Sequence, residues 1–342
     1  MSESLSEIAL AMVQEGQGIL AADESTGTIK KRFDQIELAN DEENRRAYRE
    51  MLFTADEAMT NYVSGVILFD ETLRQSTQDG RRFAEVIQAA GAVPGIKVDK
   101  GAKPMAGFPG EHVTEGLDGL RERLREYYDL GARFAKWRAV IDIAEGMPTR
   151  TAIAANAEAL ARYAALCQEN GIVPIVEPEV VMDGKNSGHD IDRCYEVTEL
   201  TLNLVFDALF AHKVSLPGMV LKPNMVVPGQ TGPQAPAQTV AEMTIACLKA
   251  TVPPAVPGIA FLSGGQSDEL ATEHLALMND IGGFPWKLTF SYGRALQQAA
   301  LKAWGGKAEN VPAAQAAFTH RARMNGLAAS GKWRPEDERQ AA

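Results

Sequence analysis

The stretch MVLKPNM, residues 219–225, places a charged residue at the end of an apolar run. The run from Met219 to Leu221 has the character of a buried strand, Lys222 follows it, and Pro223 stops it. Lysine is among the residues least often buried without a partner. A lysine at a strand end is usually just the chain emerging into water. A buried neutral amine, however, is a nucleophile toward carbonyl carbons and can form a Schiff base.

Other polar residues also follow short apolar runs. They are the acids Asp23, Glu177 and Glu179, the cations Lys97, Lys136, Arg138 and Arg294, and the small residues Ser263, Gly264, Ser291 and Gly293. Within this set, Lys136 and Arg138 are two residues apart, and side chains two apart on a strand point to one face. Each residue alone has an ordinary explanation as a turn residue, a helix N-cap or a salt-bridge partner. Their meaning depends on whether the fold brings them together.

The pattern of the apolar runs predicts that fold. Eight runs recur, namely GILAAD (18–23), VSGVILFD (63–70), GIKVDK (95–100), RFAKWRAV (133–140), IVPIVEPE (172–179), GMVLKP (218–223), GIAFLSGG (258–265) and KLTFSYGR (287–294). Successive runs begin roughly 30 to 45 residues apart, about the length of a strand, a helix and two loops. The segments between them have helical character, and two of them, DGLRERLREYYDLG and AIAANAEALARYAALCQENG, carry apolar residues at threes and fours and end in glycine. Eight such units predict an α/β fold, a (β/α)8 or TIM barrel, with a doubly wound open sheet as the alternative.

The barrel should account for the whole chain. No low-complexity segment or linker divides residues 1–342, so we expect a single TIM-barrel domain. The N-terminal stretch MSESLSEIALAMVQEG predicts an extra amphipathic helix before the first strand. It is acidic and lacks a basic start, so it does not have the pattern of a signal peptide. The polar stretch from about residue 330 to 342 predicts a flexible tail.

In such a barrel the carboxyl ends of the strands form one rim, which holds the active site. Lys136 and Lys222 would then approach within several ångströms of each other from the fourth and sixth strands. Two cations at about 4 Å and an effective dielectric of about 20 repel by roughly 4 kcal/mol, or about three pKa units. We therefore expect a lysine of this pair to have a lowered pKa and to be partly neutral near pH 7. A neutral Lys222 could form a Schiff base.

The sequence predicts two places for anion binding on this rim. At the first, the segments FLSGGQS and SYGRAL present glycine N–H groups before a helix, together with Arg294. Loops after strands seven and eight commonly hold phosphate in this fold. At the second place, the segment DESTGTIKKR puts Ser25, Thr28, Lys31 and Arg32 at the start of the first barrel helix. Two anion sites on either side of one amine predict a bisphosphate substrate.

Composition limits the partners. The net charge of -11 argues against nucleic acid or an anionic membrane as the main partner. Cys167, Cys194 and Cys247 are widely spaced and odd in number, which favours free thiols in a reducing compartment such as the cytoplasm. The five histidines (His112, His189, His212, His274 and His320) form no close pair of the kind a zinc site needs. We therefore expect no metal and no other cofactor.

The same segments resemble the class I fructose-1,6-bisphosphate aldolases, which act through a Schiff base. The resemblance covers about residues 4 to 330 and rests on GILAADESTG, EENRRAYRE, GIKVDKG, FAKWR, IVPIVEPE, LKPNM, FLSGGQS, FSYGRAL and LKAWGGK. It implies a cytoplasmic, metal-independent homotetramer that cleaves fructose 1,6-bisphosphate reversibly in glycolysis and gluconeogenesis. The products would be dihydroxyacetone phosphate and glyceraldehyde 3-phosphate.

The resemblance also implies roles for individual residues. Lys222 is similar to the Schiff-base lysine, Glu177 to the acid that dehydrates the carbinolamine, and Asp23 to the base for the carbon-4 hydroxyl. Lys136 resembles the lysine that assists imine formation, with Glu179 as its charge partner. The carbon-1 phosphate would contact Ser263, Gly264, Gly293 and Arg294. The carbon-6 phosphate would lie near Ser25, Thr28, Lys31, Arg32, Lys97 and Arg138.

The sequence departs from the animal members of that family in places. It ends in DERQAA instead of a terminal tyrosine, Thr28 stands where serine is common, and the loop MDGKNSGHD is longer. The departures bear on substrate preference and on the proton step at carbon 3. The alternatives are another Schiff-base aldolase or a transaldolase, a metal-dependent aldolase, and an added non-enzymatic scaffold role.

Overall fold

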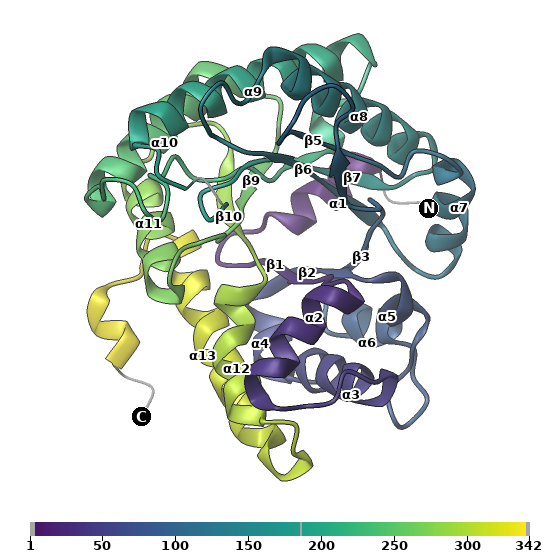
Figure 1. Ribbon diagram of the computed structural model, residues 1–342. Helices are drawn as coiled ribbons and strands as arrows, with labels where there is room; N and C mark the ends of the chain where they lie inside the picture. Colours follow the sequence, from purple (N-terminus) through teal and green to yellow (C-terminus); the bar gives the residue numbers. More distant parts are fainter. Residues whose placement is uncertain (1–3, 185–186, 340–342) are drawn as a thin grey trace.

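A closed barrel of eight parallel strands forms the centre of the computed structural model, which describes residues 4–184 and 187–339 (Figure 1). The strands are β1 (Gly18–Ala22), β2 (Val63–Leu68), β3 (Val93–Lys97), β6 (Phe134–Ile141), β7 (Val173–Val180), β8 (Val220–Leu221), β9 (Gly258–Phe261) and β10 (Lys287–Tyr292). Their order around the barrel is β1-β10-β9-β8-β7-β6-β3-β2. The predicted (β/α)8 barrel is thus confirmed, and the open-sheet alternative is wrong because β1 pairs with both β2 and β10.

Several strands of the barrel are buried on both of their faces. Every residue of β1, β2, β7 and β9 is buried, which is the condition that selects continuous apolar runs in parallel strands. The β8 strand has only two residues, and it stops there because Pro223 has no N–H to donate to a neighbouring strand. Lys222 therefore stands directly at the strand end, with its own N–H donating to the Val176 carbonyl oxygen at 2.8 Å.

Helices surround the barrel as a layer, as Figure 1 shows. They are α2 (Thr26–Phe33), α3 (Glu42–Phe53), α4 (Asp56–Asn61), α5 (Asp70–Arg74), α6 (Phe83–Ala89), α7 (Leu120–Asp129), α8 (Arg150–Glu169), α9 (Ile191–Ala211), α10 (Ala237–Thr251), α11 (Asp268–Ile281), α12 (Arg294–Trp304) and α13 (Val311–Ala329). A two-stranded hairpin of β4 (Ala102–Pro104) and β5 (His112–Thr114), which the run pattern did not predict, follows β3. No helix in the described ranges is long and apolar enough to cross a bilayer.

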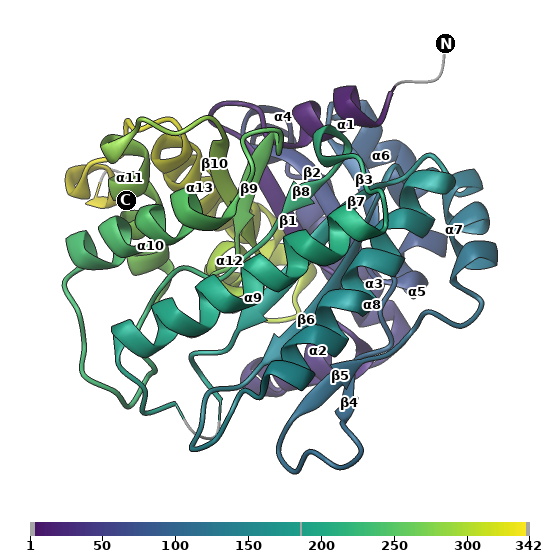
Figure 2. The same ribbon diagram turned by 90° about the horizontal axis from the view of Figure 1, so that it is seen from above.

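The predicted N-terminal helix is present as α1 (Leu5–Met12). Ser4 accepts from the Glu7 N–H, and the Glu7 side chain accepts from the Ser4 N–H, so a capping box fixes where the helix begins. Ile8 and Met12 pack in one apolar cluster with barrel residues such as Phe134. Figure 2 shows α1 and the β4–β5 hairpin at opposite ends of the barrel. The helix therefore closes the end at which the strands begin.

The C-terminal stretch, for which the sequence predicts a flexible tail, makes packing contacts through Trp333 and Glu338. Trp333 is only 7% exposed, and its indole N–H donates to Glu338. Glu338 also accepts from Arg321 of α13 at 2.6 Å and lies in η4, a short 3-10 helix (Pro335–Arg339). The buried indole and the buried guanidinium supply partners that the polar composition of the tail does not reveal. Residues 340–342 lie outside the described ranges.

The start of β1 offers a test of how tightly the barrel is packed. A Cβ added at Gly18 would lie 2.6 Å from Cδ1 of the buried Phe290 ring, whereas one at Gly27 would meet nothing within 4 Å. We expect Gly18→Ala to lower the free energy of unfolding by about 1–3 kcal/mol, the usual cost of overpacking a core. Denaturant unfolding measures this, with Gly27→Ala as the control. Equal stability of the two variants would contradict the packing described.

Candidate active site

A cavity of about 370 Å³ opens at the carboxyl ends of the strands. Its walls contain residues that lie on β1, β3, β6, β7, β8, β9 and β10 or follow them, together with residues of α2. Of the predicted site residues it includes Asp23, Ser25, Thr28, Arg32, Lys97, Lys136, Arg138, Glu177, Glu179, Lys222, Ser263, Gly264, Gly293 and Arg294. Lys31 is exposed on α2 and does not line the cavity. The rest of the predicted set meets in one place, as the barrel requires.

One carboxylate bridges the two lysines at the bottom of this cavity. Glu177, on β7, places Oε1 3.1 Å from the Lys222 Nζ and Oε2 3.2 Å from the Lys136 Nζ. All three side chains are nearly inaccessible to solvent. Lys136, on β6, also lies 2.7 Å from Oδ2 of Asp23, which follows β1. The arrangement is a buried chain of alternating charges, in the order Lys222, Glu177, Lys136, Asp23.

This chain corrects the expected electrostatics of the two lysines. Burial alone would lower the pKa of Lys136, but the carboxylates of Asp23 and Glu177 outweigh it and raise that pKa well above its ordinary value. The expectation of a lysine made neutral by a second cation is therefore wrong for Lys136. The carboxylate of Glu177 lies between the two cations and offsets their repulsion.

The two acids of the chain are held in the ionised form. Burial opposes ionisation of Asp23, but the nearby Lys136, Lys222 and Lys97 outweigh burial and hold its pKa far below the ordinary range. Burial likewise opposes ionisation of Glu177, and Lys136 and Lys222 again lower the pKa of that carboxyl. Both groups are thus carboxylates near neutral pH, with the capacity to accept a proton from a group bound beside them.

Glu179 has a different partner from the one expected. Its carboxylate forms an ion pair with Nε of Arg138, which lies two residues after Lys136 on β6. That carboxylate is the main cause of a raised pKa at Arg138. Lys136 takes its carboxylates from Asp23 and Glu177 instead. The expected pairing of Glu179 with Lys136 is therefore wrong in this structure, although both residues line the cavity.

The loops after β9 and β10 form one polar side of the cavity. Gly293 precedes Arg294 at the start of α12, where free backbone N–H groups favour an anion. A side chain at Gly264 would approach Oε1 of Glu179 to 3.2 Å, so glycine keeps that wall open. The Arg294 guanidinium lies 3.2 Å from the Asp268 carboxylate and donates to the Gln266 carbonyl oxygen.

The start of α2 forms a neighbouring wall with its own polar groups. The hydroxyls of Ser25 and Thr28 are 3.1 Å apart, and Arg32 follows Thr28 by one helical turn, so it lies on the same face. Lys97, at the end of β3, adds an ammonium group 3.7 Å from Asp99. These groups give the cavity a second place where a phosphate could bind.

The cavity wall also contains residues outside the predicted set, namely Ala21, Glu24, Asp183, Leu262, Gly265 and Ser291. Ser291 ends the eighth run, and its hydroxyl is buried without a hydrogen-bond partner among the described residues. Ser291 lies two residues before Gly293, so the alternation of side chains along a strand indicates that both face the cavity. Glu24 gave no such signal, because its partner Arg49 comes from α3. The longer loop MDGKNSGHD includes residues 185 and 186, which lie outside the described ranges.

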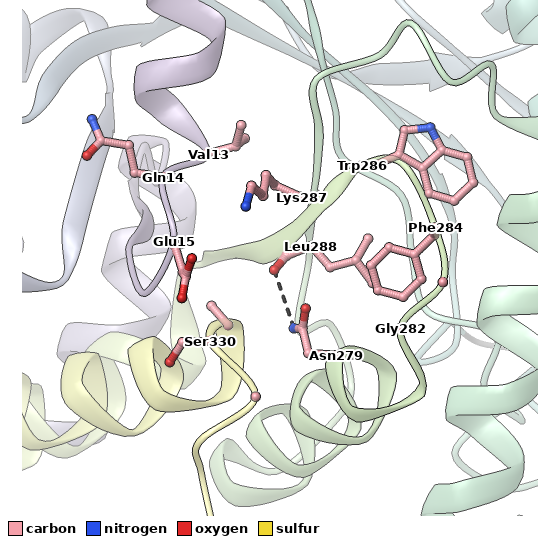
Figure 3. Close-up of a pocket in the computed structure, with 13 residues that line it drawn as sticks. Val13, Gln14, Glu15, Asn279, Gly282, Phe284, Trp286, Lys287, Leu288 and Ser330 are labelled. Carbon is pink, nitrogen blue, oxygen red and sulfur yellow. Dashed lines mark hydrogen bonds between the residues drawn. The ribbon is translucent and has the colours of Figure 1, made fainter.

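A cavity of about 330 Å³ lies at the opposite end of the barrel, where β1 and β10 begin (Figure 3). It is lined by Val13, Phe284, Trp286 and Lys287 among others. The side-chain amide of Asn279 donates hydrogen bonds to the carbonyl oxygens of Leu275, Leu288 and Ala328. The buried chain of charges is at the other end of the barrel, which makes the rim cavity the candidate active site. In the ranges 4–184 and 187–339, no three His, Cys, Asp or Glu side chains are grouped so that they could hold a metal ion.

A parallel (β/α)8 barrel with two buried lysines and two buried carboxylates at its rim defines a class of barrel proteins suited to amine chemistry on a carbonyl compound. The family model for class-I fructose-bisphosphate aldolase matches residues 4–342. The chain belongs to this class I fructose-bisphosphate aldolase family. Membership decides against a transaldolase and against a metal-dependent aldolase.

Individual relatives agree with the family model. The chain is 60% identical over 334 residues to a probable fructose-bisphosphate aldolase class 1 of Xanthomonas axonopodis pv. citri, covering 97% of this chain and 99% of the relative. It is 54% identical to cytosolic fructose-bisphosphate aldolase 5 of Arabidopsis thaliana, covering 97% and 92%. Among solved structures, a fructose-bisphosphate aldolase from Plasmodium falciparum, in complex with TRAP and a small-molecule inhibitor, superposes with a TM-score of 0.94. It is 49% identical, with 96% of this chain and 95% of that chain covered.

His274 supports the loop that carries one polar wall of the cavity. This α11 residue is 2% exposed, and its Nδ1 lies 2.7 Å from Oε1 of Gln266, whose carbonyl oxygen holds Arg294. Burial lowers the pKa of His274 to about 4. A histidine buried in the neutral form stabilises the fold above its unfolded pKa of about 6.5, because below that pH only the unfolded chain takes up the proton.

We therefore expect the free energy of unfolding to fall between pH 6.5 and pH 4 by roughly 3 kcal/mol more in the wild type than in His274→Gln. The glutamine variant does not titrate in this range, so the difference between the two proteins isolates the histidine from the carboxylates. Denaturant unfolding at a series of pH values gives the two slopes. Equal slopes would show that His274 carries its charge in the folded protein.

Proposed function

We propose that this protein reversibly cleaves fructose 1,6-bisphosphate to dihydroxyacetone phosphate and glyceraldehyde 3-phosphate through a Schiff base on Lys222. The observation that carries the proposal is the Glu177 carboxylate between the Lys222 and Lys136 ammonium groups. Family membership supplies the reaction class, and the buried chain of charges supplies the groups for it. The enzyme is then a lyase of glycolysis and gluconeogenesis.

Glu177 acts first as a base and then as an acid. Its Oε1 is 3.1 Å from the Lys222 Nζ, within reach of the proton that the ammonium must lose to become a nucleophile. The free amine attacks carbon 2 of the ketone and gives a carbinolamine. Glu177 returns the proton to the carbinolamine hydroxyl, which leaves as water and produces the iminium. Lys136, kept cationic by its carboxylates, holds Glu177 in place and stabilises the leaving oxygen.

Asp23 is the base for carbon–carbon cleavage. Its carboxylate is ionised, and the Lys136 ammonium orients it at 2.7 Å. It takes the proton of the carbon-4 hydroxyl, the bond between carbons 3 and 4 breaks, and the electron pair moves into the iminium to give an enamine. Glyceraldehyde 3-phosphate leaves. Protonation at carbon 3 and hydrolysis then release dihydroxyacetone phosphate and restore the Lys222 amine.

The two phosphates hold the substrate across the cavity. We assign the carbon-1 phosphate to Ser263, Gly264, Gly293 and Arg294, and the carbon-6 phosphate to Ser25, Thr28, Arg32 and Lys97, with Arg138 and its partner Glu179 near it. Lys31 is exposed beside this second group and contributes long-range attraction for the anion. Concentrating these cations on one rim lets a protein of net charge -11 bind a bisphosphate.

The chain acts as a single barrel domain in a homotetramer of the cytoplasm, without nucleic acid or membrane as partner. The plant relatives support the compartment, because they are named as cytosolic or cytoplasmic aldolases. A separate scaffold role has no supporting observation in the cavity.

Borohydride trapping tests the Schiff base directly. Reduction in the presence of dihydroxyacetone phosphate should inactivate the enzyme and attach a three-carbon phosphate to Lys222, because reduction makes the imine bond permanent. Peptide mass analysis locates the label, and Lys222→Gln is the control that should stay unlabelled. Label on Lys136 or Lys97 would overturn the assignment of the nucleophile.

Chelation tests whether the reaction proceeds without a metal ion. The iminium withdraws electrons from carbon 3 as a bound metal ion would, so prolonged EDTA treatment should leave the cleavage rate of fructose 1,6-bisphosphate unchanged. The rate is followed before and after dialysis against EDTA. Activity that is lost to EDTA and returns with zinc would contradict a metal-independent reaction.

A further inference from the structure

A buried carboxylate between two arginines forms part of the cavity wall beside α2. Glu24 follows Asp23 after β1, and its side chain is 4% exposed. Its Oε1 forms an ion pair with Nη1 of Arg32 on α2, and its Oε2 lies 2.5 Å from Nη2 of Arg49 on α3. Arg32 lines the cavity, whereas Arg49 is 3% exposed and does not. The two arginines therefore share one carboxylate but differ in their access to a ligand.

The charges of these three groups do not cancel. Burial opposes ionisation of Glu24, but Arg32 and Arg49 outweigh it and lower its pKa, so the group is a carboxylate. One negative charge faces two guanidinium groups, which leaves one positive charge uncompensated. If Arg49 were absent, Glu24 and Arg32 would form a neutral pair, and this wall would attract a phosphate through one positive charge fewer.

Arg49 is held rigidly enough for this task. Its guanidinium lies over the Tyr48 ring, 5.6 Å from the centroid. The Tyr48 hydroxyl donates to Gln297 of α12 at 3.0 Å, and the Gln297 amide donates to the Ala21 carbonyl oxygen at 2.7 Å. These bonds tie α3 and α12 to the end of β1, next to Asp23. Arg49 is thus fixed behind Glu24 by contacts independent of any ligand.

We propose that Arg49 neutralises Glu24 from behind, so that the charge of Arg32 remains available for the second phosphate of the substrate, and that this sets the preference for a sugar bisphosphate over a monophosphate. Arg49 is a positioning residue in this scheme, because it acts only through Glu24 and Arg32. The inference rests on the proposed function. It adds to that function the buried residue that selects the doubly phosphorylated substrate.

Steady-state kinetics on two substrates test the inference. Fructose 1,6-bisphosphate carries the second phosphate, and fructose 1-phosphate lacks it. Arg49→Gln should raise KM for the bisphosphate roughly tenfold, change kcat less than about threefold, and leave both constants for fructose 1-phosphate within about twofold. Arg49→Lys retains the charge and should stay close to the wild type with both substrates.

A double variant separates charge from structure. Glu24→Gln with Arg49→Gln removes both buried partners and again leaves the positive charge of Arg32 uncompensated. It should return KM for the bisphosphate toward the wild-type value, a rescue that a purely structural role of Arg49 does not predict. The matched control is Arg45→Gln, one turn earlier on α3, because Arg45 pairs with Glu71 and lies outside the cavity wall.

The outcomes are distinct. An equal rise of KM for both substrates, an unchanged KM in Arg49→Gln, or a double variant as impaired as the single one would each overturn the inference. If circular dichroism shows that Arg49→Gln does not fold, the test is the KM of the double variant for the bisphosphate. The inference requires this KM to lie near that of the wild type. Failure of the wild type to cleave either substrate would instead refute the proposed function.

Discussion

The Glu177 carboxylate, held between the ammonium groups of Lys222 and Lys136, is the interaction on which the account depends. Three ionised groups in a buried place are costly unless each is paired. Here each has an opposite charge within about 3 Å, and Asp23 completes the set. The chain of charges keeps two acids ready to accept protons and keeps Lys136 cationic. It also places a proton acceptor in contact with Lys222, so a nucleophilic amine can form at the moment of reaction.

The barrel is what makes that pairing possible. Asp23, Lys136, Glu177 and Lys222 come from β1, β6, β7 and β8 or from the residues directly after them. Parallel strands that close on themselves bring these distant segments to a single rim. The capped helix α1 and the apolar cluster around Phe134 fill the other end of the barrel. The residues that stabilise the barrel through apolar packing and the residues suited to catalysis therefore lie at opposite ends of the barrel.

The sequence predicted the fold because eight buried strands leave a regular pattern of apolar runs. It also predicted most of the site, since polar residues at the ends of such runs have only one rim to occupy. The partners of those residues were harder to foresee. Whether Glu179 faces Arg138 or Lys136, and whether a carboxylate lies between two lysines, depends on the side-chain directions of neighbouring strands.

Contacts between segments distant in the sequence were also hard to foresee. Glu24, which follows β1, contacts Arg49 of α3, and Glu338 of the C-terminal stretch contacts Arg321 of α13. Neither contact has a local sequence signal. The polar composition of the tail does not show which of its charges find buried partners.

The most direct test of the central claim is the rate at which Lys222 forms a Schiff base in Glu177→Gln. The amide keeps the shape of the side chain but cannot take the Lys222 proton. Rapid mixing with dihydroxyacetone phosphate, a borohydride quench and mass analysis would give this rate. We expect a fall of about 100-fold or more, the usual contribution of a positioned acid–base group. Labelling of Lys222 at the wild-type rate in a folded variant would contradict the account.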